Sequence, residues 1–332
     1  MIRLIDSVEG VEVNQVEDNK EWLELKNTVL SFWINTRNDY FPGPQPVSLD
    51  RNNIPNLEKY AYKACMKYDG DRFMMLCTTF HGENCTFLVD RTFRFFKLYQ
   101  NWDPVIYKNS LWDGELVKNK STWVYVIHDC IALKGENISQ ENLEIRLNAL
   151  NKSLGEDLDT SHKADLTIQS KKFVNLENIE DLVKLYTTDT DLVNYKTDGI
   201  IFTPIKKPVG TGTFHPLKKW KPCGSHTFDF KLNERHDRYI IQAKNKGEII
   251  SYASIQKNSK KGMKFSDRLT EIKASSGNII ECTYDENEEI YVPFCVRKDK
   301  THPNNLITID KTHNNIYENI KIEEFYGLKT RN

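Results

Sequence analysis

The amino-acid sequence predicts an α+β domain followed by a smaller all-β domain. Residues 60–135 consist of short apolar runs broken by turns, and several runs alternate or are rich in β-branched and aromatic residues, which is typical of strands. Two stretches with helical periodicity follow, at 139–155 and 175–188, before strand patterns return. From about residue 238, short strand patterns are evenly spaced without long helices between them, which favours a small barrel, most commonly an OB-fold.

These patterns place the first domain at residues 1–231 and the OB-fold domain at residues 232–317. A helical pattern at about 318–332 is expected to pack back on the first domain. The connector FPGPQPVSLDR, at 41–51, carries three prolines and is predicted to form neither a helix nor a central strand. A hydrophobic content of 39% is sufficient for a buried core and argues against global disorder.

The charge balance bears on nucleic-acid binding. The chain has 46 lysines and arginines against 47 aspartates and glutamates, so its bulk charge gives no reason to expect nonspecific binding of a polyanion. Between residues 196 and 221, however, six lysines accompany Asp198 alone, a local excess that suits a polyphosphate or an RNA end. A solvated, lysine-rich loop at 205–208 is the simpler account of two of these lysines.

Seven cysteines lack any C-x-x-C or other zinc-ligand spacing, which favours buried free thiols in a reducing compartment. The N-terminal residues lack a long apolar segment, and apolar residues nowhere run to 18 in succession. We therefore expect a soluble intracellular protein without a membrane partner.

The stretch MKYDGDRFMML, at 66–76, allows two interpretations: a solvated hairpin turn or a loop that carries a nucleophile. A lysine is mostly protonated at neutral pH and becomes nucleophilic when neighbouring cations or desolvation lower its pKa. Here Lys67 precedes Asp69 and Gly70, which permit a tight turn, and Arg72, which can reach a phosphate or ribose. Taken alone, this string fits a surface turn as well as a catalytic loop.

Further polar residues follow at predicted strand ends, each of them ordinary when considered singly. Asp-Gly pairs are commonly turns, and neighbouring lysines are commonly solvated. Carboxylates at such positions also suit ribose hydroxyls or Mg²⁺, and alternate residues of an extended segment lie on one side. Their occurrence once each, in one order along most of the chain, favours a shared site. The set comprises Arg91, Asp113, Glu115, Asp198, Lys219, Lys221, Asp229, Arg297, Asp299 and Lys300.

This ordered set resembles the covalent nucleotidyltransferases, a superfamily of ATP-dependent polynucleotide ligases and GTP-dependent mRNA capping enzymes. LKKWKPCGSHTFDF at 217–230 and VRKDKTHPN at 296–304 are similar to the capping-enzyme versions of the last two motifs. The connector at 41–51 and the compact length resemble the small monofunctional guanylyltransferases of large DNA viruses, the chlorella virus enzyme among them. The resemblance implies a nucleotidyltransferase domain with mixed and antiparallel sheets, flanking helices and a C-terminal OB-fold.

The resemblance further implies that Lys67 attacks the α-phosphate of GTP, releases pyrophosphate and forms a lysine-GMP phosphoamide. GMP then passes to the 5'-diphosphate end of RNA to give a GpppN cap. By the same resemblance, Mg²⁺ or Mn²⁺ is the cofactor, with Asp198 and Glu115 as its ligands. The resemblance also assigns the remaining roles. Arg72 and Glu115 hold the ribose, and Arg91 contacts the ribose or a phosphate. Lys219 and Lys221 contact the α-phosphate, whereas the pyrophosphate is oriented by Arg297, Asp299 and Lys300. The GTP-binding set is completed by Asp69, Gly70, Asp113 and Asp229.

One residue departs from the family pattern. His128 stands in VIHDC where the family usually has an aromatic residue, commonly Phe. Its imidazole can stack on guanine with Ile201 on the opposite face, over a smaller area and with a charge that varies with pH. A satisfied core histidine is the equally plain alternative.

Two other functions remain open from the sequence. KYDGDR by itself also fits an ATP-dependent RNA or DNA ligase with a lysine-AMP intermediate, and an OB-fold also occurs in non-catalytic RNA-binding proteins. For a capping enzyme of this size, separate proteins are expected to supply RNA triphosphatase and cap methyltransferase activities. If the protein is viral, it is expected in the host cytoplasm or nucleus.

Overall fold

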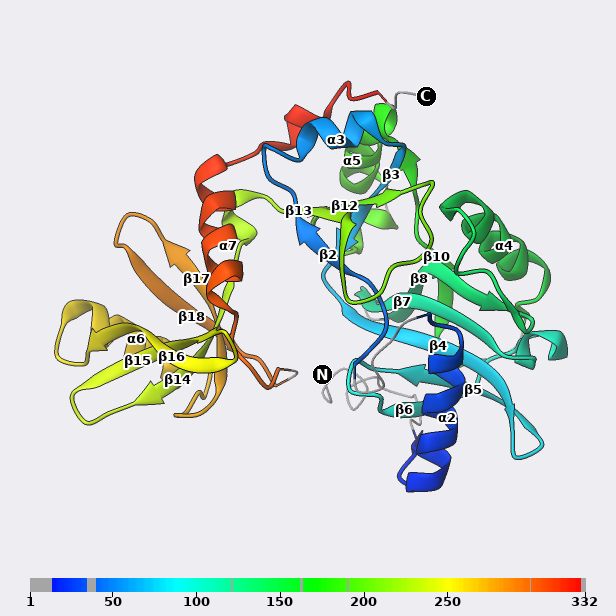
Figure 1. Ribbon diagram of the computed structural model, residues 1–332, viewed down its shortest axis with the longest axis horizontal. Helices are drawn as coiled ribbons and strands as arrows, with labels where there is room; N and C mark the ends of the chain where they lie inside the picture. Colours follow the sequence, from blue (N-terminus) through cyan, green and yellow to red (C-terminus); the bar gives the residue numbers. More distant parts are fainter. Residues whose placement is uncertain are drawn as a thin grey trace. The chain divides into compact units, whose positions relative to one another are not determined.

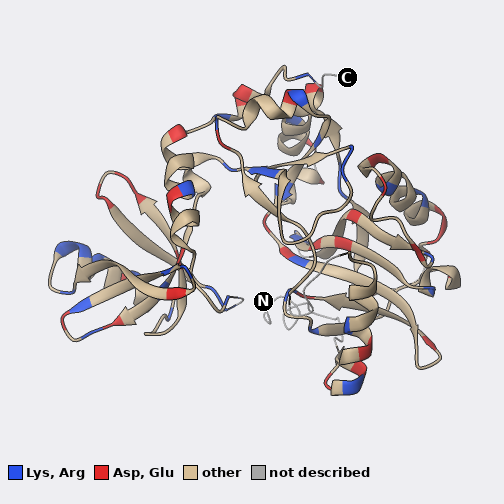
Figure 2. Cartoon of the chain, in the orientation of Figure 1, with Lys and Arg blue, Asp and Glu red and all other residues tan. Residues whose placement is uncertain are grey.

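The computed structural model describes residues 14–34, 40–120, 122–161, 164–189, 191–298 and 300–329 (Figure 1). The chain forms two compact units: the first runs to Trp220 and resumes at Ile322, and the second runs from Lys221 to Lys321. The division lies before residue 231 because β14 (Phe228–Glu234) pairs with strands of the second unit. Basic and acidic residues are interspersed over both units (Figure 2), in keeping with their near-equal numbers.

The larger sheet of the first unit has the order β1-β6-β5-β4-β7-β8-β10 among the described residues, with β9 beside β8. Neighbouring strands are antiparallel except β8 and β10, which are parallel. This sheet confirms the strands predicted within 60–135. The strands are β1 (Asn14–Gln15), β4 (Asp71–Phe80), β5 (Glu83–Val89), β6 (Phe95–Leu98), β7 (Ser110–Asn119), β8 (Thr122–Leu133), β9 (Glu136–Asn137) and β10 (Thr167–Ser170).

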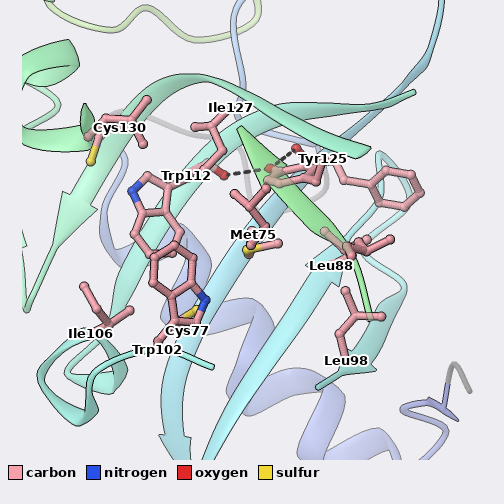
Figure 3. Packing of buried hydrophobic residues seen from close by; sticks show 14 of the residues in the cluster. Met75, Cys77, Leu88, Leu98, Trp102, Ile106, Trp112, Tyr125, Ile127 and Cys130 are labelled. Carbon is pink, nitrogen blue, oxygen red and sulfur yellow. Dashed lines mark hydrogen bonds between the residues drawn. The ribbon is translucent and has the colours of Figure 1, made fainter. Parts of the chain in front are cut away.

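Two helices cover opposite faces of this sheet. Helix α4 (Leu143–Glu156) shares a core with alternate residues of β4 such as Met75, whereas α2 (Asn19–Ser31) packs with the intervening residues such as Met74. The α4 core also contains Trp102 and Trp112, whose rings stack 4.9 Å apart (Figure 3). Because successive side chains of a strand point to opposite faces, the continuous apolar run of β4 is buried on both sides.

The smaller sheet of the first unit carries the candidate nucleophile. Its order is β11-β3-β12-β13-β2, and all neighbours are antiparallel except β13 and β2. The proline-rich connector forms the edge strand β2, as expected for a segment excluded from a sheet centre. The strands are β2 (Gln45–Ser48), β3 (Tyr62–Tyr68), β11 (Val174–Asn175), β12 (Thr197–Pro204) and β13 (Thr213–Trp220), with helices α3 (Ile54–Lys59) and α5 (Ile179–Thr188) in the same unit.

The second unit is a sheet of order β16-β15-β14-β17-β18 with antiparallel neighbours, as the evenly spaced patterns predicted. No pairing between β16 and β18 is found among the described residues, so a closed OB-fold barrel stays a prediction. Two helices were missed by the sequence analysis. Most exposed residues of α6 are polar, and its large apolar residues in the core are Phe265 and Leu269. The remaining elements are β15 (Arg238–Asn245), β16 (Glu248–Gln256), α6 (Lys260–Glu271), β17 (Ile279–Asp285), β18 (Ile290–Val296) and α7 (Leu306–Glu318).

The helix expected at about 318–332 is wrong in its extent. Helix α7 ends where Asn319 takes a left-handed conformation, with φ of 44°. A 3₁₀ turn at Ile322–Phe325 then joins the first unit, where Phe325 packs against Phe202 and Trp220. None of the helices in the described residues is long and apolar enough to cross a membrane.

The Phe325 contact generates a stability prediction. Replacing Phe325, which is fully buried, with Ala is expected to lower the free energy of unfolding by about 3–5 kcal/mol in urea denaturation. The matched control is Tyr99→Ala, since Tyr99 is 62% exposed, and it is expected to change the value by no more than about 0.5 kcal/mol. Similar losses in both variants would contradict an anchoring role for Phe325.

Candidate active site

Lys67 lies near the end of β3 and pairs in register with Gly199 of β12. The register shifts between Thr197 and Gly199, so a β-bulge removes Asp198 from the ladder and redirects its side chain. Gly199 has φ of 151°, a conformation that favours glycine. Lys67 Nζ donates to Asp198 Oδ1 at 2.7 Å, and the two side chains are 23% and 18% exposed. Asp198-Gly199 therefore lies at a bulge, which places the Asp198 carboxylate against the amine of the candidate nucleophile, Lys67.

One face of the smaller sheet brings three predicted residues together. Cys65 of β3 is opposite Ile201 of β12, which in turn is opposite Lys219 of β13. Directly opposed residues on neighbouring strands project to the same face, and so do residues two apart on one strand. Lys67, Ile201 and Lys219 therefore share one face of the sheet.

Arg72, near the start of β4, is held from two sides. Its Nε donates to Asp113 Oδ1 of β7 at 2.9 Å, and Nη2 donates to the other carboxylate oxygen. Its Nη1 donates to the carbonyl oxygen of Pro44 at 2.5 Å. Burial by itself acts to raise the pKa of Asp113, but Arg72 and then His128 outweigh it and hold that pKa well below its usual range. Arg72 and Asp113 thus form a buried, bidentate ion pair.

His128 lies at a second β-bulge. Asp113 is opposite Asp129 and Gly114 is opposite Ile127, which leaves His128 as the extra residue of β8. Its Nε2 is 3.4 Å from Asp113 Oδ1, and its side chain is 25% exposed. The other ring nitrogen, Nδ1, is buried and has no hydrogen-bond partner among the residues that the structure describes. A core histidine and stacking on guanine both stay predictions.

Sequence reasoning missed Lys171, which directly follows β10. Its Nζ is 3.3 Å from Glu115 Oε2 and 4.4 Å from the ring centre of Tyr68, the neighbour of Lys67. Its side chain is only 4% exposed. A buried ammonium needs a paired charge, and here Glu115 supplies it. The sequence shows only two successive lysines after TIQS, and nothing there distinguishes the buried lysine from a solvated one.

The turn between β3 and β4 is partly solvated and partly packed against the site. Asp69 forms an exposed ion pair with Lys196, whose Nζ is 2.8 Å from Asp69 Oδ2. At Gly70, a Cβ would lie 2.5 Å from the carbonyl oxygen of Leu116 and 3.1 Å from Glu115 Cγ. The turn is thus pressed against β7 beside Glu115. A hairpin turn and a catalytic loop are compatible descriptions of this stretch.

Arg91 is exposed in the turn that follows β5. The preceding Asp90 is buried and organises the turn: its Oδ1 accepts from the backbone N–H groups of Thr92 and Arg94, and its Oδ2 accepts from Arg94 Nε at 2.7 Å. The contact of Arg91 with a nucleotide stays a prediction.

The candidate residues of the second unit converge on Asp229. Its Oδ1 accepts from Arg297 Nη1 at 3.2 Å, and its Oδ2 accepts from Lys300 Nζ and from Asn304 Nδ2. Asp229 therefore fixes both cations of the R-x-D-K string. Asp299 lies outside the described residues. Lys221 is half-buried and is the first residue of this unit.

Asp198 and Glu115, the carboxylates expected to bind a divalent cation, differ in their surroundings. The described residues contain no group of three or more His, Cys, Asp or Glu side chains that could hold a metal. Mg²⁺ is usually held by only one or two carboxylates together with substrate phosphates and water, so Asp198 beside Lys67 fits this mode. At Glu115, by contrast, Oε2 already faces the Lys171 ammonium.

Asp113→Asn is expected to lower the free energy of unfolding by about 3–5 kcal/mol at neutral pH, because Arg72 is left buried without its counter-charge. A carboxylate whose pKa is depressed in the folded state stabilises the protein above its unfolded pKa, and this contribution is lost as the pH falls. The difference between wild type and Asp113→Asn should therefore shrink below about pH 4 in urea denaturation. The control is Asp191→Asn, whose side chain is 85% exposed; a difference that persists unchanged at low pH would contradict the prediction.

Comparison with known proteins gives the family. A family model described as mRNA capping enzyme, catalytic domain, matches residues 5–223, and one described as mRNA capping enzyme, C-terminal domain, matches residues 213–326. An mRNA-capping enzyme of Danio rerio is 28% identical over 327 residues, covering 90% of this chain and 50% of that protein. The mRNA-capping enzyme subunit alpha of Saccharomyces cerevisiae is 32% identical over 220 residues, covering 58% of this chain and 48% of that protein.

The corresponding subunit alpha of Schizosaccharomyces pombe is 28% identical over 246 residues, covering 68% of this chain and 61% of that protein. The chain thus spans about half the length of the curated relatives it matches. Because the catalytic-domain model alone matches more than half of the sequence, the chain belongs to the mRNA capping enzyme family.

Proposed function

We propose that this protein is an mRNA guanylyltransferase, a nucleotidyltransferase that passes GMP from GTP to the 5'-diphosphate end of RNA. The observation that carries the proposal is Lys67 at a strand end, hydrogen-bonded to Asp198 and sharing a sheet face with Lys219, in a chain of the capping enzyme family. A nucleophile, an acidic partner and a second cation are what an attack on a phosphate requires.

In the first step, Lys67 Nζ forms a bond with the α-phosphorus of GTP, and the bond from that phosphorus to the bridging oxygen breaks. Nζ loses one proton before the attack, which frees its lone pair, and a second proton as the nitrogen–phosphorus bond forms. Water and the Asp198 carboxylate, which already accepts from Nζ, take these protons. Pyrophosphate leaves with the electron pair of the broken bond. Lys219 stabilises the negative charge that develops on the α-phosphate oxygens. The product is a lysine-GMP phosphoamide.

In the second step, an oxygen of the RNA β-phosphate attacks the same phosphorus. The nitrogen–phosphorus bond breaks, Lys67 recovers its protons, and a GpppN end is released. Of the six lysines between 196 and 221, Lys218 is buried and Lys196 forms an ion pair with Asp69. The exposed Lys206 and Lys207 support an RNA phosphate path, since a local basic excess favours a polyanion.

The ribose contacts are assigned to Glu115 and Arg72, which are opposite each other on β7 and β4. Lys171 neutralises Glu115 at Oε2 and leaves its other oxygen as an acceptor for a hydroxyl. Arg91, Asp69 and Gly70 complete this part of the proposed GTP set. In the second unit, Lys221 is proposed to contact the α-phosphate. Arg297 and Lys300, which both pair with Asp229, are proposed to orient the pyrophosphate.

Mg²⁺ or Mn²⁺ is the proposed cofactor, with Asp198 as its main protein ligand and Glu115 as the second candidate. When bound, the cation would neutralise phosphate charge and so lower the cost of bringing GTP to Lys67. The relatives named subunit alpha support the existence of partner proteins, and we propose separate RNA triphosphatase and cap methyltransferase proteins, with an intracellular site of action.

Lys67 can be tested by incubating the protein with α-labelled GTP and a divalent cation and separating it under denaturing conditions. Label is expected on the wild-type protein and none on Lys67→Arg, which keeps the charge beside Asp198 but removes the amine nucleophile. The matched control is Lys63→Ala, since Lys63 lies on the same strand and face, and it should retain label. Label from ATP but not from GTP would favour a ligase, and label on Lys67→Arg would refute the nucleophile.

Lys219→Ala is expected to slow adduct formation by about 10²–10³-fold, the usual effect of removing one group that stabilises an oxyanion. The reason is the loss of its charge at the α-phosphate, so the fall should appear in the rate at saturating GTP. Lys206→Ala is the control, because Lys206 is exposed in the turn after β12. Equal rates for the two variants would remove Lys219 from the site.

A further inference from the structure

The connector residues Phe41 to Pro44 wrap around the guanidinium of Arg72. The Pro44 carbonyl accepts from Nη1 at 2.5 Å, and the Phe41 ring centre lies 5.6 Å from Arg72 Cζ. The ring of Phe41 is itself 6.2 Å from that of Phe93 and joins the core beneath α2. The guanidinium therefore has a carboxylate on one edge, a carbonyl on another and an aromatic ring nearby.

Gly43 makes this arrangement possible. A Cβ built on Gly43 would lie 2.5 Å from Arg72 Nη2, 3.0 Å from Arg72 Cζ and 2.9 Å from Phe41 Cε1. Contacts under 3.0 Å are not sustained by real side chains, so any larger residue must displace the guanidinium or the ring. A side chain at this position would therefore act on Arg72 and Phe41.

We propose that residues Phe41–Pro44 form a positioning clamp that aims Arg72 at an oxygen of the bound nucleotide, an inference that rests on the proposed function. Arg72 has five N–H donors, and the Asp113 carboxylate and the Pro44 carbonyl take three of them. The remaining donors, one on Nη1 and one on Nη2, are fixed in direction by these contacts. Such donors suit a ribose hydroxyl or a phosphate oxygen.

The clamp also connects Arg72 to the sheet that bears Lys219. Directly after Pro44, the chain enters β2, which pairs with β13 so that Ser48 is opposite Lys219. The backbone N–H of Gln45 donates to the carbonyl oxygen of Gly212 at 2.6 Å, beside the start of β13. The clamp therefore sets Arg72 and Lys219 relative to each other within the first unit, and misplacements of about 1 Å can cost 10²-fold in rate.

A double-mutant cycle on Lys67 adduct formation tests the clamp. Gly43→Ala is expected to lower the apparent second-order rate constant with GTP by about 10–100-fold, mainly through a raised KM, because Arg72 is displaced. In an Arg72→Lys background, which keeps a cation beside Asp113 but removes the planar fork, Gly43→Ala should change the rate constant by less than about twofold. A purely structural role for Gly43 predicts the same loss in both backgrounds and would overturn the clamp.

Gly155→Ala is the matched control, since a Cβ at Gly155 meets nothing within 4 Å, and its rate constant should equal that of wild type. The same cycle measured by urea denaturation tests the contact without activity: the free-energy losses of Gly43→Ala and Arg72→Lys should be non-additive. Additive losses would overturn the clamp. A wild-type protein that takes no label from GTP refutes the proposed function, whereas a normal adduct rate in Gly43→Ala refutes the clamp alone.

Discussion

The buried ion pair between Arg72 and Asp113 is the interaction on which the rest of the candidate site depends. It joins β4 to β7, and through Pro44 and His128 it also joins the connector and β8. Two charges in a dry environment are tolerated only when each is paired and hydrogen-bonded. The four segments must therefore be in place together for both charges to be paired. The lowered pKa of Asp113 reflects its pairing with Arg72 and His128. The larger sheet thus delivers a fixed cation two residues after the β3–β4 turn.

Two of the three Asp-Gly strings of the site lie at bulges, whereas Asp69-Gly70 lies in the turn between β3 and β4. At Asp198-Gly199 and Asp113-Gly114 the register of the antiparallel ladder shifts, and the residue removed from it is Asp198 in one case and His128 in the other. At Gly114 a Cβ would lie 2.8 Å from the carbonyl oxygen of Val126, so glycine permits the close approach of β8. A bulge re-aims one side chain without ending the strand. One bulge places Asp198 against Lys67, and the other places His128 against Asp113.

The charges near Lys67 alternate in sign. Asp198 contacts Lys67, Lys171 contacts Glu115, and Arg72 contacts Asp113. Each cation is satisfied by a carboxylate before any nucleotide arrives, which limits the electrostatic cost of keeping several charges half-buried. In the proposed reaction, the phosphates of GTP compete with these carboxylates for the cations.

The sequence by itself determined the fold class, the α4 and α5 helices and many of the strands, because local periodicity reports burial. It also supplied the candidate members of the site, because the motif residues have fixed spacing. It indicated that Lys67, Asp198 and Lys219 belong to one site, but not which contacts and which strand register bring them there. Only the tertiary structure decided that Lys171 is buried on Glu115, that His128 contacts Asp113, and that Gly43 lies against Arg72. These contacts join residues from 15 to 56 positions apart, and they depend on strand register, which no local pattern contains. Helices α6 and α7 were missed for a related reason: their few apolar residues become a helical face only against the core they cover.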